Sequence, residues 1–366
     1  MKIIAAVSRE GAAAPRIEQV DLEAPRSDEV RVRIVATGIC HTDLHCHSGI
    51  GMPVPKPIVL GHEGAGIVEE IGAGVTDLVV GDHVVISGGS CGVCRSCRAA
   101  RPTYCHDAMR LAFGGQRVDG SSPLSQDGVR IAGSFFAQSS FATHAVVPTR
   151  SAVKVPRDVP LELLGPLGCG IITGAGSVIE AFALRPGQSI AVFGVGSVGL
   201  AAVMAARLAG GSRIVAVDVD QARLDLAVEL GATDAVLSSA GIDCILREIS
   251  PEGFDYSFNT TSAPAVWDAA LACLGMEGTA GVVTRPIGNW TPNTGQLLAG
   301  GQKLRGILGG SAAPQLFIPT LIDYWRQGRF PFDRLVQRFD FEDIDAAWSA
   351  CHSGAAIKPV LIMGQA

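Results

Sequence analysis

Four of the ten cysteines fall within fifteen residues, where two Cys-x-x-Cys steps share one residue: Cys91, Cys94, Cys97 and, after a seven-residue loop, Cys105. Four thiolates fill the tetrahedral coordination of Zn²⁺ and leave no position open for a substrate. The spacing therefore predicts a structural zinc site, in preference to a redox dithiol or to unrelated thiols. Metal binding is expected to stabilise the irregular loop that carries it.

A second set of candidate ligands is dispersed along the chain: Cys40 in GICHTD, His62 and Glu63 in GHEGAG, and Cys169 in GPLGCGIITG. Each residue taken alone is more often a packed side chain than a ligand. Together, two thiolates and one imidazole can hold a catalytic zinc with one open position. Glu63 is expected to ligate transiently or to tune this site, and Asp43 to bind the ligand imidazole from behind.

The segment from Gly194 to Gly199 has the pattern Gly-x-Gly-x-x-Gly, with Gly196 in the middle and Val198 before the last glycine. It lies between an apolar run at 189–193 and a helical pattern at 198–210, which is the context that a dinucleotide fingerprint requires. Asp218 ends the next predicted strand, nineteen residues after the last glycine. Its carboxylate is expected to accept hydrogen bonds from the adenosine ribose and to repel a 2′-phosphate, so NAD is predicted over NADP.

Two regions with different sequence patterns must position these residues. Short apolar runs separated by Gly, Pro and Asp occupy the first ~150 residues (30–38, 64–72, 81–87 and 141–148), and they favour an antiparallel, barrel-like β domain. After about residue 170, predicted strands (189–194, 213–218, 235–237, 254–259, 279–284, 303–308) alternate with predicted helices (198–210, 221–231, 267–275). This alternation predicts βαβ units around a doubly wound parallel sheet. The last ~55 residues predict an amphipathic helix from 319 and a final strand at 357–363.

The composition excludes several classes of protein. The chain has 366 residues, 48% hydrophobic and only 17% charged, which fits about two domains with full cores and argues against disorder. A formal net charge of −6 without a basic run gives no surface for nucleic acid or acidic membranes. No export signal or membrane-spanning segment is predicted, so we expect a cytoplasmic protein without disulfides. The remaining cysteines are expected to be ordinary thiols: Cys46, Cys244, Cys273 and Cys351.

Taken in order, these motifs resemble the zinc-dependent medium-chain alcohol dehydrogenase family over essentially the whole chain. The stretches GSFFAQSSFATHA, LELLGPLGCGIITGAG and GILGGSAAPQLFIPTLIDYWRQGRFPFDRL resemble its aryl-alcohol (benzyl-alcohol) subgroup. The resemblance implies a GroES-like β-rich catalytic domain made of residues 1–170 and 309–366, and an NAD-binding Rossmann domain at 171–308. It also implies two zinc ions per chain, the catalytic one on Cys40, His62 and Cys169.

The same resemblance assigns roles to four further residues. Thr42 matches the hydroxyl that bonds the substrate alcohol, and His45 matches the imidazole at the solvent end of a proton relay. His41 takes a position near the cofactor pyrophosphate, and Lys358 is expected to approach the same phosphates.

The substrate pocket is expected to include Phe135, Phe136 and, near its inner end, Ile307, because adjacent aromatic rings suit a flat ring or a long apolar tail. One of the two phenylalanines is as readily a core residue. Ser87 and the two glycines after it stand where related sequences carry bulkier residues, which predicts a wider pocket.

The implied activity is NAD-linked oxidation of primary aromatic or allylic alcohols to aldehydes, with a small-molecule alcohol or aldehyde as the substrate. Alternatives are a terpenoid allylic alcohol such as geraniol or perillyl alcohol, a thiol adduct of formaldehyde, or a non-catalytic zinc- and nucleotide-binding module. The last requires a missing ligand or relay residue, and all are present. The family also implies a homodimer or homotetramer, with strands near 279–308 at the interface.

Overall fold

A computed structural model describes residues 1–364. The chain divides into two compact units, each of which is described separately. Unit 1 contains residues 1–169, residues 313–320 and the chain from Asp333 onward, whereas unit 2 contains residues 170–312 and 321–332. Both units therefore draw on segments that are distant in the sequence.

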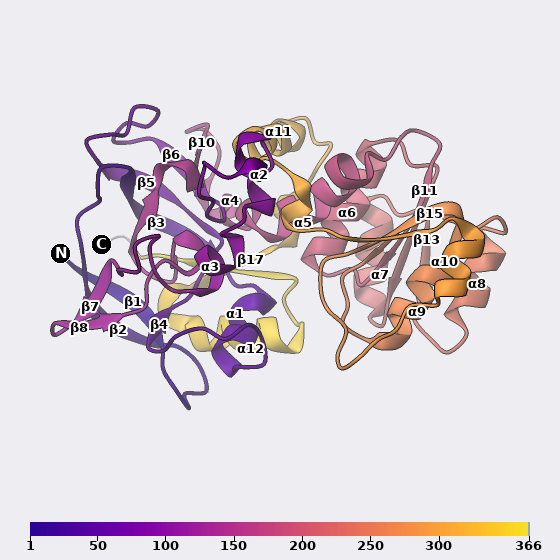
Figure 1. The fold of residues 1–366 in the computed structure, drawn as a ribbon, viewed down its shortest axis with the longest axis horizontal. Coiled ribbons are helices and arrows are strands. Elements are labelled where there is room, and N and C mark those ends of the chain that lie inside the picture. The colour runs from indigo at the N-terminus through magenta and orange to yellow at the C-terminus, as the bar shows by residue number, and fades with distance from the viewer. Residues whose placement is uncertain (365–366) are drawn as a thin grey trace. The chain divides into compact units, whose positions relative to one another are not determined.

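Unit 1 is built from two sheets (Figure 1). The five-stranded sheet has the order β4-β1-β2-β7-β8, with the strands β1 (Lys2–Ser8), β2 (Arg16–Leu22), β4 (Ile58–Val59), β7 (Leu124–Gln126) and β8 (Val129–Ile131). The seven-stranded sheet follows the path β10-β6-β5-β3-β18-β17, and β9 also pairs with β3. Its strands are β3 (Glu29–Gly38), β5 (Gly64–Ile71), β6 (His83–Ile86), β9 (His144–Pro148), β10 (Ala152–Val155), β17 (Val336–Asp340) and β18 (Lys358–Ile362).

Strand β3 lies at the centre of the larger sheet because its residues alternate in character. Val30, Val32 and Ile34 are at most 1% exposed. Full burial of each such side chain stabilises the fold by about 1.5–3 kcal/mol. The intervening Arg31 and Arg33 point away and form ion pairs with glutamates of the neighbouring β5. The strand is therefore rigid where it ends, two residues before Cys40.

Short helices connect the strands of unit 1. They are α1 (His41–Ser48), α2 (Arg95–Arg98), α3 (Ala108–Phe113), α4 (Leu161–Leu164) and α12 (Ile344–Ser353). The helix α11 (Pro314–Arg326) contains residues of both units. It begins five residues before the predicted start, so Pro319 lies inside the helix and does not open it.

Unit 2 has one six-stranded sheet in the order β13-β12-β11-β14-β15-β16, and every neighbouring pair is parallel. The strands are β11 (Ser189–Phe193), β12 (Arg213–Asp218), β13 (Asp234–Leu237), β14 (Phe254–Asn259), β15 (Leu274–Val282) and β16 (Lys303–Gly306). The helices are α5 (Gly170–Gly176), α6 (Ser197–Leu208), α7 (Gln221–Leu230), α8 (Ile242–Ile249), α9 (Pro264–Ala272) and α10 (Thr294–Gly300). The order reverses between β11 and β14, which is the arrangement of a doubly wound dinucleotide fold.

The predicted parallel sheet is confirmed, and three helices of unit 2 (α5, α8 and α10) were not predicted. The helices α5 and α10 are short and contain several glycines, and α8 is amphipathic but only eight residues long, so none of the three gave a clear helical signal. Among residues 1–364, no single helix is long and apolar enough to cross a membrane. Only the bent pair Leu161–Gly168 and Gly170–Phe182 reaches that length and composition together.

Candidate active site and metal centres

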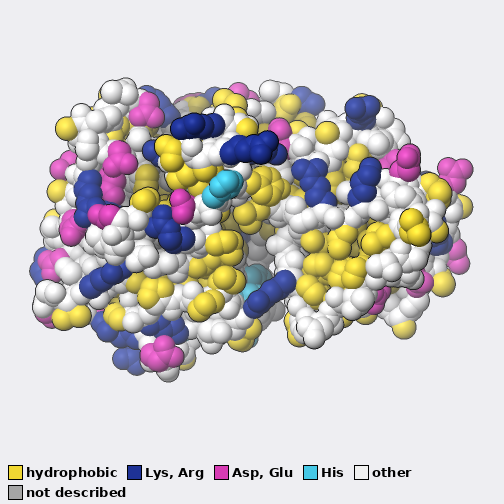
Figure 2. Space-filling view, in the orientation of Figure 1, with side chains coloured by type: hydrophobic (Ala, Val, Ile, Leu, Met, Phe, Trp, Pro, Cys, Tyr) yellow, Lys and Arg dark blue, Asp and Glu magenta, His cyan; other side chains and the backbone are white. Residues whose placement is uncertain are grey.

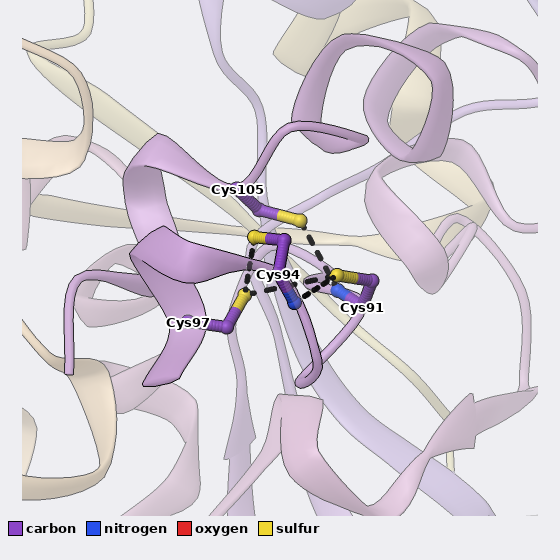
Figure 3. Close-up of side chains that lie close together, drawn as sticks. All are labelled: Cys91, Cys94, Cys97 and Cys105. Atoms are coloured by element: carbon purple, nitrogen blue, oxygen red, sulfur yellow. Dashed lines mark hydrogen bonds between the residues drawn. The ribbon is translucent and has the colours of Figure 1, made fainter. Parts of the chain in front are cut away.

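The four clustered cysteines converge on one point in unit 1 (Figure 3). The sulfur of Cys97 lies 3.5 Å from that of Cys94 and 4.0 Å from that of Cys91. Four sulfurs around a tetrahedral zinc, each about 2.3 Å from the metal, lie about 3.8 Å apart. All four sulfurs, including that of Cys105, lie within 4.8 Å of one another, so the donor set and its spacing fit zinc.

Backbone amides donate hydrogen bonds to these sulfurs and favour negative charge on Cys91 and Cys94, whereas burial raises the pKa of Cys105 to about 12. Cys105 Sγ accepts hydrogen bonds from the amides of Cys91 at 3.2 Å and Asp107 at 3.4 Å. Cys91 Sγ accepts one from the amide of Cys94 at 3.3 Å. Backbone hydrogen bonds from the segments of Cys97 and His106 lower the pKa of Cys94 to about 6. The loop therefore presents at least one sulfur that is a thiolate at neutral pH, which is the form that binds metal.

Replacing Cys97 by serine should remove one metal from unit 1 and destabilise it. Structural zinc contributes on the order of 10 kcal/mol in small zinc domains, and a loss of even about 3 kcal/mol lowers the melting temperature by roughly 6–12 °C. Zinc analysis and thermal unfolding measure both effects. Cys244→Ser is the control, because Cys244 is an exposed thiol of unit 2. Unchanged zinc content in Cys97→Ser would contradict the assignment.

The dispersed candidate ligands also come together, on three different segments of unit 1. Cys40 follows β3 and directly precedes α1, His62 and Glu63 precede β5, and Cys169 follows the turn Gly165–Gly168. One ligand atom from each of these four residues lies within 4.8 Å of the other three. The ends of three packed segments thus place two thiols, an imidazole and a carboxylate around one point.

Asp43 holds two of these segments together, as predicted. Its Oδ2 accepts the amide hydrogen bond of Cys40 at 3.0 Å, and its Oδ1 accepts that of Gly61 at 3.0 Å. The same Oδ1 lies 3.0 Å from Nδ1 of His62, and both side chains are fully buried. His62 Nε2 is buried and has no hydrogen-bond partner among residues 1–364. Because Nδ1 is engaged by Asp43, Nε2 is left to bind a metal, so this site also fits zinc.

The buried groups of the site shift one another's pKa values in opposite directions. A hydrogen bond from Cys169 and the positive charges of His62 and Lys358 lower the pKa of Cys40 well below its usual range, although burial opposes this shift. The same contact with Cys40, together with burial, raises the pKa of Cys169. Burial lowers the pKa of His62, but Asp43 and Cys40 outweigh it, so the pKa of His62 is raised well above its ordinary value. A bound cation would favour the deprotonated form of both sulfurs, so metal binding here should release protons.

Lys358, at the start of β18, lies deep in the same cluster. Its Nζ donates to Glu63 Oε1 at 3.0 Å and to the carbonyl of Ile39 at 3.2 Å, and its side chain is 3% exposed. Burial raises the pKa of Glu63, although the Lys358 ammonium opposes this shift. The expected approach of Lys358 to cofactor phosphates is not favoured by this placement, because the ammonium is paired with a buried carboxylate. Sequence reasoning had not connected Lys358 with Glu63.

Thr42, His41 and His45 all lie on α1, beside Cys40. The hydroxyl oxygen of Thr42 is 3.7 Å from the Cys40 sulfur, so Thr42 borders the candidate metal site. His45 and His41 are exposed, and their rings lie 6.2 Å apart. One short helix thus carries a half-buried hydroxyl beside the candidate metal site and, three residues further on, an exposed imidazole.

Two phenylalanines pack against the His62 ring, and a third packs against them. Phe136 stacks on it with ring centres 4.5 Å apart and 23° between the planes, and Phe135 meets it edge-on at 5.6 Å. Phe113, at the end of α3, packs edge-on against both phenylalanines. Phe135 is fully buried and is a core residue, so only Phe136 and Phe113 remain as aromatic surface. Phe113 was missed from the sequence, where it is one apolar residue of a short helix.

The expected widening near Ser87 is only partly supported. Ser87 is buried and donates a hydrogen bond to the carbonyl of Ser151 at 3.3 Å. A Cβ at Gly89 would lie 2.5 Å from the Cβ of Ala137, so a neighbouring side chain already occupies that space. A Cβ at Gly88 would lie 3.8 Å from the Phe136 ring. Ile307 belongs to unit 2, where it is buried beside Gly281.

The dinucleotide fingerprint forms the turn between β11 and α6 in unit 2. Gly194 has φ of +82°, and a Cβ at Gly199 would overlap the Gly194 carbonyl, so both positions require glycine. No described atom lies within 4 Å of a Cβ placed at Gly196, which leaves its backbone open at the start of α6, where Val198 lies in the first turn. Asp218 ends β12, and its Oδ2 accepts the amide of Val195 at 2.7 Å. The helix start and open glycine backbone fit a pyrophosphate, and the adjacent carboxylate fits a ribose.

Comparison with known proteins agrees with this geometry. Residues 26–157 match the alcohol dehydrogenase GroES-like domain, and residues 197–324 match the zinc-binding dehydrogenase domain. A geraniol dehydrogenase of Castellaniella defragrans is 47% identical over 363 residues, which are 98% of this chain and 97% of that protein. Two solved structures cover 100% of both chains: an alcohol dehydrogenase zinc-binding domain protein from Burkholderia ambifaria (48% identity, TM-score 0.97) and benzyl alcohol dehydrogenase from Acinetobacter calcoaceticus (41%, TM-score 0.96).

Proposed function

The chain belongs to the zinc-dependent medium-chain alcohol dehydrogenases, which have a GroES-like and a Rossmann-like domain and use zinc and NAD as cofactors. From that premise we propose that it oxidises primary aromatic or allylic alcohols. We assign residues 1–170 and 309–366 to the catalytic domain and residues 171–308 to the NAD-binding domain. The catalytic zinc is assigned to Cys40, His62 and Cys169, and the structural zinc to the four clustered cysteines.

In this mechanism, zinc supplies Lewis acidity that makes the alcohol hydroxyl more acidic. Thr42 is the hydroxyl that would orient the alcohol and accept its proton while giving up its own, and His45, exposed on the same helix, would deliver the released proton to water. Asp43 fixes the orientation of His62. The phenylalanines on the His62 ring exclude water from the reacting carbon, and the fingerprint of unit 2 binds NAD.

The substrate class rests above all on the aromatic surface beside the metal-ligand imidazole. Phe136 lies parallel to His62, and Phe113 packs against it, so the space next to the site is bounded by flat apolar rings. Such a surface favours a planar, conjugated substituent on the alcohol carbon by stacking and by burial. The benzyl alcohol dehydrogenase at 41% identity agrees with an aromatic alcohol, and the geraniol dehydrogenase at 47% makes a terpenoid allylic alcohol the second candidate.

A panel of alcohols tests this proposal. NAD⁺ reduction at 340 nm by the zinc-loaded enzyme is compared for benzyl alcohol, cinnamyl alcohol, geraniol, perillyl alcohol and ethanol, and for formaldehyde with a thiol. We expect kcat/KM for the benzylic or allylic alcohols to exceed that for ethanol by at least about 100-fold, which corresponds to about 2.8 kcal/mol of added binding. Preference for ethanol or for the thiol adduct would overturn the substrate class and leave the dehydrogenase chemistry standing.

Replacing His45 by glutamine should slow proton release without removing metal. We expect hydride transfer at neutral pH to fall roughly tenfold and its dependence on pH to change, because the relay loses its titratable end. Stopped-flow measurement of NADH formation between pH 6 and 9 checks this result. His352→Gln is the control, since His352 is also an exposed imidazole of unit 1, on α12. An unchanged pH profile in His45→Gln would remove His45 from the relay.

We further propose that two copies of the chain associate through β16. This strand is at the end of the sheet order, and its four residues are exposed, including Leu304 at 40%. Leu298 and Ile287 nearby in the sequence are 85% and 72% exposed, and Figure 2 shows hydrophobic side chains at the surface of this unit. An edge strand presents unpaired backbone groups on which a second chain can pair, and Leu304 adds an apolar side chain at this edge.

The substitution Leu304→Lys should weaken this association at least about 100-fold, because a charge replaces an apolar contact beside a paired edge. Sedimentation velocity over a range of concentrations measures the change. Leu316→Lys alters a leucine of unit 1 that is 73% exposed, and it should leave the oligomer intact. An oligomer unaffected by Leu304→Lys would contradict the assigned interface.

A further inference from the structure

The segment Ser134–Ser139 has an unusual backbone. Four of its residues have positive φ without being glycine: Ser134 (91°), Phe136 (52°), Ala137 (60°) and Ser139 (57°). A non-glycine residue in such a conformation costs on the order of 1–3 kcal/mol, and it persists only where surrounding contacts hold it. The contacts that hold this segment therefore indicate which part of the molecule its backbone conformation serves.

Ser139 closes the segment on itself. Its buried hydroxyl accepts hydrogen bonds from the amides of Ser134 and Phe135, both at 2.9 Å. The same hydroxyl donates to the carbonyl of Val59 at 2.6 Å. The segment is thus fastened to β4, three residues before His62.

Gln138 attaches the segment to the candidate zinc site. Its side chain is 2% exposed. Nε2 donates to the carbonyl of His62 at 3.0 Å, and Oε1 accepts from the amide of Gly64 at 3.1 Å. These two partners fix which end of the carboxamide is oxygen, because one partner only accepts and the other only donates. One side chain thus binds the main chain on both sides of Glu63.

The fit between the two segments is close. A Cβ at Gly64 would lie 2.8 Å from the Cβ of Ser140 and 3.2 Å from Oε1 of Gln138. Glycine is therefore needed at position 64 for the Ser134–Ser139 segment to reach the ligand loop. On its other side, the ligand loop is held by Asp43, which accepts the Gly61 amide and contacts the His62 ring.

We propose that Gln138 is a positioning residue of the reaction, which holds the main chain of His62 and Gly64 so that the His62 imidazole stays directed at Cys40 and Cys169. The same segment presents Phe136 to the face of that imidazole, with ring centres 4.5 Å apart. Gln138 therefore couples the wall of the substrate pocket to the geometry of the metal site. The inference rests on the proposed function only in taking Cys40, His62 and Cys169 as the catalytic zinc ligands.

The test uses the full-length enzyme with two variants and one matched control. Gln138→Met keeps the length of the side chain and removes the hydrogen bonds to His62 and Gly64, together with a longer one of 3.5 Å to the carbonyl of Ile86. Gln138→Glu keeps an acceptor for Gly64 and loses the donor to His62, so it carries the test if the methionine variant fails to fold. The control Ser140→Ala removes a buried hydrogen bond of 2.8 Å to Thr37 from the adjacent residue, without touching the hydrogen bonds to His62 and Gly64.

Two readouts are independent of alcohol turnover: the rate at which each zinc is lost to a chelator, and the visible spectrum after Co²⁺ replaces the catalytic zinc. We expect both Gln138 variants to release one zinc about 10- to 100-fold faster and to shift the Co²⁺ bands, with release of the second zinc unchanged. Ser140→Ala should match the unsubstituted enzyme.

Native release rates and Co²⁺ bands in a folded Gln138 variant would overturn the inference, as would equal changes in Ser140→Ala. If the unsubstituted enzyme binds only one zinc, the proposed function and this inference fail together. If it binds two and oxidises alcohols while the Gln138 variants behave normally, only the inference fails.

Discussion

Replacing Cys169 by serine should reduce bound zinc from two ions per chain to one and lower kcat/KM for alcohols by at least about a thousandfold. A catalytic metal contributes several kcal/mol of transition-state stabilisation, and each 1.36 kcal/mol changes a rate tenfold. Serine is close in size to cysteine but is a poor ligand for zinc, so the loss is specific to the metal. Zinc analysis and steady-state kinetics measure the two effects.

The fold should survive this change, because Cys169 lies in the connection between the Gly165–Gly168 turn and α5 and is not part of a sheet. Circular dichroism and thermal unfolding of unit 1 should remain close to those of the unsubstituted enzyme. The contrast with Cys97→Ser is informative, since that change should lower stability. Full activity of Cys169→Ser with one zinc per chain would contradict the assignment of the catalytic ligands.

Replacing Asp218 by asparagine should change the cofactor preference. The carboxylate accepts amide hydrogen bonds from Val195 and, through its other oxygen, from Val219 and Asp220. The same carboxylate is expected to accept hydrogen bonds from the ribose hydroxyls of NAD⁺, and asparagine would weaken these. Hydrogen bonds to a charged group contribute about 1.5–3 kcal/mol, so kcat/KM for NAD⁺ should fall roughly 10- to 100-fold. Loss of the negative charge also removes the repulsion of a 2′-phosphate, so kcat/KM for NADP⁺ should rise.

Asp220→Asn provides the matched control for this substitution. Asp220 lies two residues further on, and its carboxylate caps α7 by accepting the amides of Ala222 and Arg223. Asparagine is an equally good cap, so stability and cofactor preference should both be retained. A preference for NAD⁺ that persists in Asp218→Asn, or that moves equally in both variants, would remove Asp218 from cofactor selection.

Local spacing made several parts of the molecule predictable. The cysteine cluster converges because only two or seven residues separate successive ligands, and such short connections keep the four sulfurs close together. The fingerprint at Gly194 was recognised because the strand, the turn and the helix are consecutive. Asp43 was also predicted from its place close to Cys40, and its contact with His62 is confirmed.

The sequence did not reveal contacts that join distant segments. Gln138 and His62 are 76 residues apart, and Lys358 and Glu63 are 295 apart. A buried glutamine or lysine has no periodicity of its own, and each is buried here only because another segment satisfies its hydrogen bonds. Phe113 was missed for a related reason: an apolar residue at the end of a short helix is common, and its neighbours became clear only in three dimensions.

Strand β18 also affects when the enzyme can assemble. It pairs with β3 and brings Lys358 to Glu63. The buried carboxylate of Glu63 therefore gains its ion pair only after the last part of the chain has been made. At a synthesis rate of about 5–20 residues per second, 295 residues take roughly 15–60 s. During that interval β3 lacks its neighbour β18, and Glu63 lacks the ammonium group of Lys358. Metal loading on the ribosome is therefore expected to begin at the cysteine cluster, and the catalytic centre is completed only after the C-terminal strand has emerged.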